Sequence, residues 1–164
     1  IQDADQMGAS KEYKEIFEKE IDDNIDILRS AFERGVPLLC GSETGFSVTP
    51  YGDWHYKELE VFVEKLGLTP LEAITCATRN SSLAMRQEDK IGLISEGYLA
   101  DLLIVDGDPS KDVSMLGKKS LIKNVFLNGE EVDLTPPAKR IKDPDGWRVS
   151  SYSKRILKKD TKQE

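Results

Sequence analysis

Near the start of the chain, hydrophobic residues recur every three or four positions and are separated by charged ones. This spacing places them on one face of an α-helix. Ser10 is a suitable N-cap and Gly35 a suitable residue just past the C-terminus, so the pattern predicts a helix over 10–34. The charged positions indicate a solvated opposite face. The hydrophobic face consists of Tyr13, Phe17, Ile21, Ile25, Leu28 and Phe32.

A run of consecutive hydrophobic residues follows and ends in small polar residues around one carboxylate, Glu43. Uninterrupted hydrophobic runs are typical of strands that helices cover on both faces. We therefore expect a buried strand over 37–40 in an α/β fold. Ligands bind at the carboxyl ends of such strands, so the loop over 41–54 is the candidate site.

Two further helices are predicted after this loop. Thr69-Pro70-Leu71-Glu72 combines an N-cap, a proline in the first helical position and a capping box. The helix that it starts should run through residue 77 and form again over 80–86. The preceding helix should end at Gly67 and present a hydrophobic face formed by Leu59, Phe62, Val63 and Leu66.

After Lys90 the pattern changes to short β-like runs over 91–97, 100–106 and 121–127. Asn128-Gly129 predicts a hairpin turn. Asp-Gly-Asp-Pro over 106–109 predicts another turn, with cation binding by its carboxylates as the alternative. We expect structural roles for Gly92 and Gly97 in turns, and for the Asp101 carboxylate in fixing the adjacent backbone.

Composition narrows the possible functions. The net charge of −7 argues against nucleic acid as the main partner. Without a leader signal or a hydrophobic run of about 20 residues, we expect a cytoplasmic protein that does not enter the membrane. Cys40 and Cys76 fit core packing in a reducing compartment, and a reactive thiol is the alternative. Because the first residue is Ile1, we expect a processed chain or part of a longer one.

Residues 135–164 differ from the rest in charge, with nine Lys/Arg against four Asp/Glu. The segment also contains Trp147 and Tyr152, which are unusual in a purely solvated tail. We expect a basic C-terminal extension. In order of preference, it is a flexible extension, an arm that packs on a partner subunit, or a nucleic-acid contact.

Three segments, 69–80, 91–109 and 122–132, closely resemble the C-terminal part of the metal-dependent amidohydrolase superfamily. The nearest branch is similar to imidazolonepropionases and Xaa-Pro dipeptidase-like enzymes. The most specific segment is Ile91-Gly-Leu-Ile-Ser-Glu-Gly-Tyr-Leu-Ala-Asp-Leu102. The resemblance implies the last part of a (β/α)8 TIM-like barrel over 1–89, with strand eight at 37–40. Residues 90–134 would be the C-terminal strands of a small β-sandwich.

The resemblance implies a role for Glu43. In the family, strand eight ends in a Gly-Thr-Asp-x-Gly-like motif, whose aspartate binds metal and shuttles a proton. Glu43 stands at that position, so it is our candidate catalytic residue and metal ligand. Its extra methylene displaces the carboxylate, and misplacement by about 1 Å can cost roughly 100-fold in rate. The alternative is that Glu43 only caps the strand or forms a salt bridge.

The resemblance also places a substrate mouth in the loop after the strand. His55 would hydrogen-bond a substrate carboxylate or carbonyl, or else pack beside Trp54 in the first turn of the next helix. The expected substrate-binding residues are Thr44, Ser47, Tyr51, Trp54 and His55.

The family's other metal ligands are a His-x-His pair on strand one, a Lys or Glu on strand four, and histidines on strands five and six. His55, the only histidine, matches none of them. The family's site for a divalent metal, which we expect to be zinc, therefore cannot be assembled from this chain alone.

We hypothesise that the chain is part of a metal-dependent amidohydrolase, which cleaves amide, carbamate, urea-like or peptide C–N bonds in small molecules. It would require an upstream N-terminal half or partner subunit, in a homo- or hetero-oligomer. One alternative is a degenerate, non-catalytic homologue that acts as a binding or assembly module. Another is a chain that does not fold alone.

Overall fold

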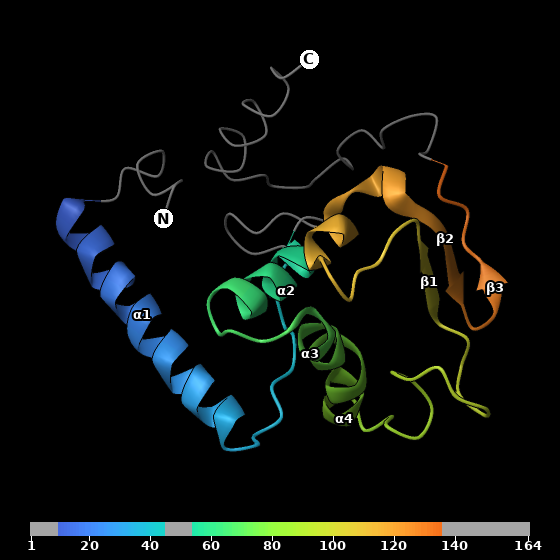
Figure 1. The fold of residues 1–164 in the computed structure, drawn as a ribbon, viewed down its shortest axis with the longest axis horizontal. Coiled ribbons are helices and arrows are strands. Elements are labelled where there is room, and N and C mark those ends of the chain that lie inside the picture. The colour runs from blue at the N-terminus through green and yellow to red at the C-terminus, as the bar shows by residue number, and fades with distance from the viewer. Residues whose placement is uncertain (1–9, 45–53, 136–164) are drawn as a thin grey trace, which may run out of the picture. The chain divides into compact units, whose positions relative to one another are not determined.

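The computed structural model describes residues 10–44 and 54–135. The described elements all belong to one structural unit, which ends at Asp133. In chain order (Figure 1), they are α1 (Lys11–Glu33), α2 (Trp54–Glu64), α3 (Pro70–Thr75), a π-helical turn (Cys76–Asn80), α4 (Ser81–Ala84), β1 (Leu102–Val105), two 3-10 turns (Val113–Gly117 and Lys119–Leu121), β2 (Ile122–Leu127) and β3 (Glu130–Glu131).

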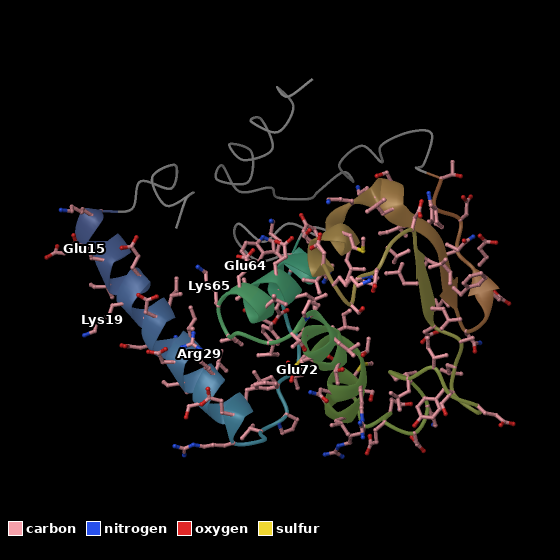
Figure 2. The ribbon with its side chains drawn as sticks, viewed as in Figure 1. Glu15, Lys19, Arg29, Glu64, Lys65 and Glu72 are labelled. Atoms are coloured by element: carbon pink, nitrogen blue, oxygen red, sulfur yellow. The ribbon has the colours of Figure 1, made fainter. Side chains whose placement is uncertain are left out.

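Helix α1 confirms the prediction of a helix over 10–34. Its C-terminal half is attached to the rest of the unit, since Ile25 and Phe32 pack against the core. Arg29 Nη2 also donates a 2.6 Å hydrogen bond to the carbonyl of Lys65, directly after α2 (Figure 2).

The expected buried face of α1 is covered only in part. Ile21 and Leu28 are 42% and 41% exposed, contrary to the prediction. A hydrophobic helix face is buried only where a second layer packs against it, and the described chain supplies core contacts at Ile25 and Phe32. The side chains of Tyr13 and Phe17 lie outside the described part.

Residues 37–40 do not form the strand that we predicted. A strand requires a neighbouring strand for its backbone groups, whereas the described partners here are side chains. Asn80 Nδ2 donates to the carbonyl of Leu38 at 2.7 Å, and Glu58 Oε1 accepts from the Gly41 amide at 2.9 Å. The expected burial holds for Leu38, which is 9% exposed, but Leu39 is exposed.

The hydrophobic core gathers around α2 and α3. The predicted face of α2 and the residues after it is confirmed, because Leu59, Phe62 and Leu66 are buried and Val63 packs against them. Gly67 ends this stretch with φ +77°, a left-handed conformation that favours glycine. The buried hydrophobic residues are Leu38, Leu59, Phe62, Leu66, Leu68, Ala73, Cys76 and Val113.

Helix α3 begins with the predicted capping box. The Thr69 side chain accepts from the Glu72 amide, and Glu72 Oε2 accepts from the Thr69 amide at 2.8 Å. These hydrogen bonds lower the pKa of Glu72. The helix then continues through the π-helical turn into α4, and Ser81 Oγ donates to the Cys76 carbonyl at 2.8 Å. The sequence pattern gave no indication of this π-helical turn.

The three strands form an antiparallel sheet in the order β1-β2-β3. The hairpin predicted at Asn128-Gly129 is confirmed, with φ values of +53° and +81° that suit a type I′ turn. Asp101 Oδ1 accepts from the Asn128 amide at 2.7 Å, so its expected structural role is also confirmed. These are the only strands among the described residues; a β-sandwich stays a prediction.

The run over 91–97 is a series of turns and not a strand. Gly92 and Gly97 have φ values of +90° and +85°, which are incompatible with an extended strand. At Gly92 a Cβ atom would lie 2.8 Å from the Thr78 carbonyl oxygen and 3.1 Å from Arg79 Cα. This glycine therefore allows the chain to pass directly over the π-helical turn.

The turn predicted over 106–109 is observed around Asp108. Its carboxylate accepts from the Ser110 amide at 3.1 Å and lies 2.9 Å from Lys111 Nζ. The hydrogen bonds from Ser110 and Lys111 lower the pKa of Asp108. These contacts account for Asp108 without a bound cation.

We expect Gly92→Ala to destabilise the fold more than Gly97→Ala. Both substitutions place a side chain at positive φ, which costs about 1 kcal/mol. A Cβ at residue 97 would enter open space, whereas one at residue 92 would collide with backbone. Overpacking adds about 1–3 kcal/mol at Gly92. Urea unfolding of both variants measures the difference, and equal losses would contradict the close approach.

Candidate functional site

The candidate site is centred on residues 38–42, which we call the anchored segment, and on Glu43 directly after it. Three side chains from α2 and the π-helical turn lie within hydrogen-bond distance of the anchored segment. Glu43 is exposed and has φ +47°, in the left-handed region that few non-glycine residues adopt. Such backbone conformations cluster at functional sites.

The first turn of α2 carries two predicted residues, Trp54 and His55, and brings His55 next to this segment. His55 Nδ1 lies 3.3 Å from Ser42 Oγ, within hydrogen-bond distance. Trp54 precedes His55 and is half-buried. Thr44 follows Glu43, while Ser47 and Tyr51 lie outside the described residues. The structure thus brings His55 to the end of the anchored segment.

A pocket of about 290 Å³ lies between the anchored segment, α2 and the helical residues after α3. Its lining offers two hydroxyls, an imidazole and a carboxylate, which suit a polar ligand. His55 is the one predicted site residue in this lining; Glu43, Thr44 and Trp54 are not part of it. The lining residues are Cys40, Gly41, Ser42, His55, Glu58, Ala77 and Ser81.

The sequence analysis did not identify Glu58 or Ser42 as site residues. Glu58 Oε1 accepts from the Gly41 amide at 2.9 Å, across 17 positions of sequence. A signal was available, because residues three apart on a helix share one face. Glu58 and His55 have that spacing, and both line the pocket.

The two cysteines are in the core, as predicted. Cys76 is 1% exposed, and its burial raises the pKa of the thiol. Cys40 is half-buried, and burial, followed by the nearby Glu58 charge, raises the pKa of its thiol to about 12. Since the thiolate is the nucleophile, neither cysteine has the electrostatic environment of a reactive thiol.

We expect Cys40 to resist alkylation in the folded chain at neutral pH, because its thiol stays protonated. Its raised pKa contributes stability that is present below the ordinary value of 9.0 and is lost as pH rises towards about 12. Iodoacetamide labelling followed by mass spectrometry measures the alkylation of Cys40. Urea-unfolded chain is the control and should label at both cysteines. Rapid labelling of folded Cys40 would contradict the prediction.

Metal binding requires more ligands than the described residues bring together. Among residues 10–44 and 54–135, no three His, Cys, Asp or Glu side chains lie close enough to hold an ion. A zinc site needs about three or four protein ligands. The Glu43 carboxylate has suitable ligand chemistry but is a single donor, so these residues alone do not fit a complete metal site.

The chain belongs to the amidohydrolase family, whose sequence pattern matches residues 10–132. Ochratoxinase of Aspergillus niger is 30% identical over 110 residues, which are 66% of this chain and 22% of the relative. Imidazolonepropionase of Aeromonas hydrophila is 30% identical over 98 residues, 59% of this chain and 23% of the relative. The family predicted from the sequence is thereby confirmed.

Solved structures give the same picture. The Aspergillus niger ochratoxinase structure matches with a TM-score of 0.66 and 29% identity, covering 74% of this chain and 27% of that chain. The structure of a Xaa-Pro dipeptidase with bound methionine matches with a TM-score of 0.58 and 35% identity, covering 66% of this chain and 25% of that chain. The structure of a putative prolidase from Bifidobacterium longum matches with a TM-score of 0.72 and 23% identity, covering 96% of this chain and 35% of that chain. At this identity, the match shows the fold alone.

These comparisons confirm the α/β class in its coarse form. The chain spans about a quarter of the length of the relatives it matches. Among the helices that the structure describes, none combines the length and hydrophobicity needed to cross a bilayer.

Proposed function

We propose that this chain is the C-terminal part of a metal-dependent amidohydrolase that hydrolyses amide-type C–N bonds. The family match over residues 10–132 carries this proposal. Its support at the site is Glu43, which directly follows an anchored segment and has an unusual backbone conformation. The names of the matched relatives, which include a dipeptidase and an imidazolonepropionase, agree with a hydrolase.

In this proposal, residues 37–40 are the eighth strand of a (β/α)8 barrel and pair with barrel strands from upstream sequence. Their hydrophobic character suits such a strand. The described chain satisfies the Leu38 carbonyl with Asn80, and in this proposal the upstream strands pair with other backbone groups of the segment. Residues 90–134 are the C-terminal strands of a β-sandwich.

Glu43 is the general base of the proposed reaction. Its carboxylate accepts a proton from the attacking water and delivers it to the leaving nitrogen of the substrate. A divalent metal, which we propose to be zinc, would lower the pKa of that water when bound, with Glu43 as one of its ligands. Residues around the loop bind the small amide-type substrate: Thr44, Ser47, Tyr51, Trp54 and His55.

Two exposed hydrophobic surfaces support a protein partner, which we propose to be the upstream N-terminal half or a partner subunit in an oligomer. On α1, Ile16 and Ile27 are 61% and 65% exposed. Among the described strands, β1 lies at one edge of the sheet, and its Leu103 and Ile104 are 46% and 45% exposed. Exposed hydrophobic edges are sites of strand pairing. We place the assembly in the cytoplasm.

The second candidate is a non-catalytic homologue that acts as a binding or assembly module. One specific observation favours it, since Glu43 stands where the family resemblance places an aspartate. The longer side chain would then leave the carboxylate out of position for the reaction.

We expect Glu43→Gln to lower kcat by at least about 100-fold in the complete enzyme, because the amide cannot accept the proton. The assay follows hydrolysis of dipeptides, N-acyl amino acids and carbamates in the presence of zinc. Glu64→Gln, an exposed substitution on α2, is the control and should retain activity. A fully active Glu43→Gln enzyme would exclude Glu43 as the base. A wild-type enzyme inactive on every substrate would favour the non-catalytic candidate.

A further inference from the structure

The backbone before Glu43 is held by hydrogen bonds at positions close to one another. Asn80 Nδ2 donates to the Leu38 carbonyl at 2.7 Å, and the Gly41 amide donates to Glu58 Oε1 at 2.9 Å. Ser42 Oγ lies 3.3 Å from His55 Nδ1. These contacts come from two elements, α2 and the π-helical turn, that are distant from this segment in sequence.

We propose that Glu58 is a positioning residue for Glu43. By accepting the hydrogen bond of the Gly41 amide, it fixes the backbone two residues before Glu43 and thereby the direction of the Glu43 carboxylate. This inference rests on the proposed function, because it takes Glu43 to be the general base.

Gly41 is the point in the segment that most needs an external constraint. Glycine loses more conformational freedom on folding than any other residue. Among the described residues, packing does not restrict it, since the nearest atom to an added Cβ would be Leu39 Cδ1 at 4.0 Å. The hydrogen bond to Glu58 is the side-chain contact that the structure provides at this glycine.

Glu58 is well suited to supply that constraint. Hydrogen bonds to a carboxylate are roughly twice as strong as those between neutral groups. The helix that carries it is firmly packed, because Leu59 and Phe62 are only 6% and 7% exposed. Among the ion pairs of the described residues, none involves Glu58, so no described lysine or arginine holds its carboxylate.

The contacts of His55 and Asn80 with the anchored segment constrain the backbone before Glu43 less than the Glu58 contact does. Ser42 and His55 are separated by 3.3 Å, a long hydrogen bond. Asn80 acts at Leu38, five residues before Glu43, with Gly41 in between. Loss of the Glu58 contact would therefore free the backbone closest to the proposed base. A misplacement of about 1 Å can cost roughly 100-fold in rate.

The first part of the test measures the backbone itself. Hydrogen–deuterium exchange of a peptide spanning 38–44 is compared in the complete protein between wild type, Glu58→Ala and Glu64→Ala. We expect the Gly41 amide to exchange at least about tenfold faster in Glu58→Ala, and Glu64→Ala to match wild type. Unchanged exchange in Glu58→Ala would overturn the proposal.

The second part measures catalysis, where a purely structural role and a positioning role differ. We expect Glu58→Ala to lower kcat by about 10- to 100-fold with little change in KM. Glu58→Gln should recover most of kcat, since its amide oxygen can still accept the hydrogen bond. Glu58→Asp keeps the charge but has a shorter side chain, so we expect its kcat to match that of Glu58→Ala. If Glu58→Ala does not fold, Glu58→Asp takes its place in the test.

Several results of the activity assays would also overturn the proposal. Wild-type kcat in both Glu58→Ala and Glu58→Asp would show that Glu43 needs no such support. A rise in KM alone would make Glu58 a substrate-binding residue. Full activity of Glu43→Gln, assayed in parallel, would overturn the proposed function together with the inference. An inactive Glu43→Gln with unaffected Glu58 variants would overturn the inference alone.

Discussion

The hydrogen bond from Asn80 Nδ2 to the Leu38 carbonyl is the interaction on which the described site depends. It spans 42 positions of sequence at 2.7 Å. Leu38 is in the core and this hydrogen bond is partly buried, so a carbonyl left without a partner there is costly. No described strand supplies that partner, so an asparagine in the π-helical turn does. The contact joins the chain after α1 to the π-helical turn that follows α3.

The same π-helical turn is where two of the segments that resemble the family meet. The segment over 69–80 forms α3 and this turn, and Gly92 of the second segment lies directly against the backbone of Thr78 and Arg79. Any side chain at Gly92 would separate the two segments. Asp101, near the end of the second segment, then fixes the β2–β3 hairpin through the Asn128 amide.

Features encoded by local sequence were predicted well. Helix α1, the capping box of α3 and the Asn128-Gly129 hairpin each depend on residues that lie close together in the chain. The run over 37–40 forms no strand in the described chain, because hydrophobicity indicates burial but does not supply a neighbouring strand. At the site, the roles assigned to Glu43 and His55 stay predictions, although His55 does line the pocket. Glu58 was missed because its hydrogen bond to Gly41 is visible only once α2 is placed in space.

The most direct test of this account is the free energy of unfolding of Asn80→Ala, measured by urea titration against wild type. Asn124→Ala is the matched control, because the Asn124 amide bonds to the exposed side chain of Glu131. The account predicts a loss of about 1–3 kcal/mol for Asn80→Ala, since a partly buried carbonyl loses its partner, and a smaller loss for the control. Equal stability of Asn80→Ala and wild type would contradict it.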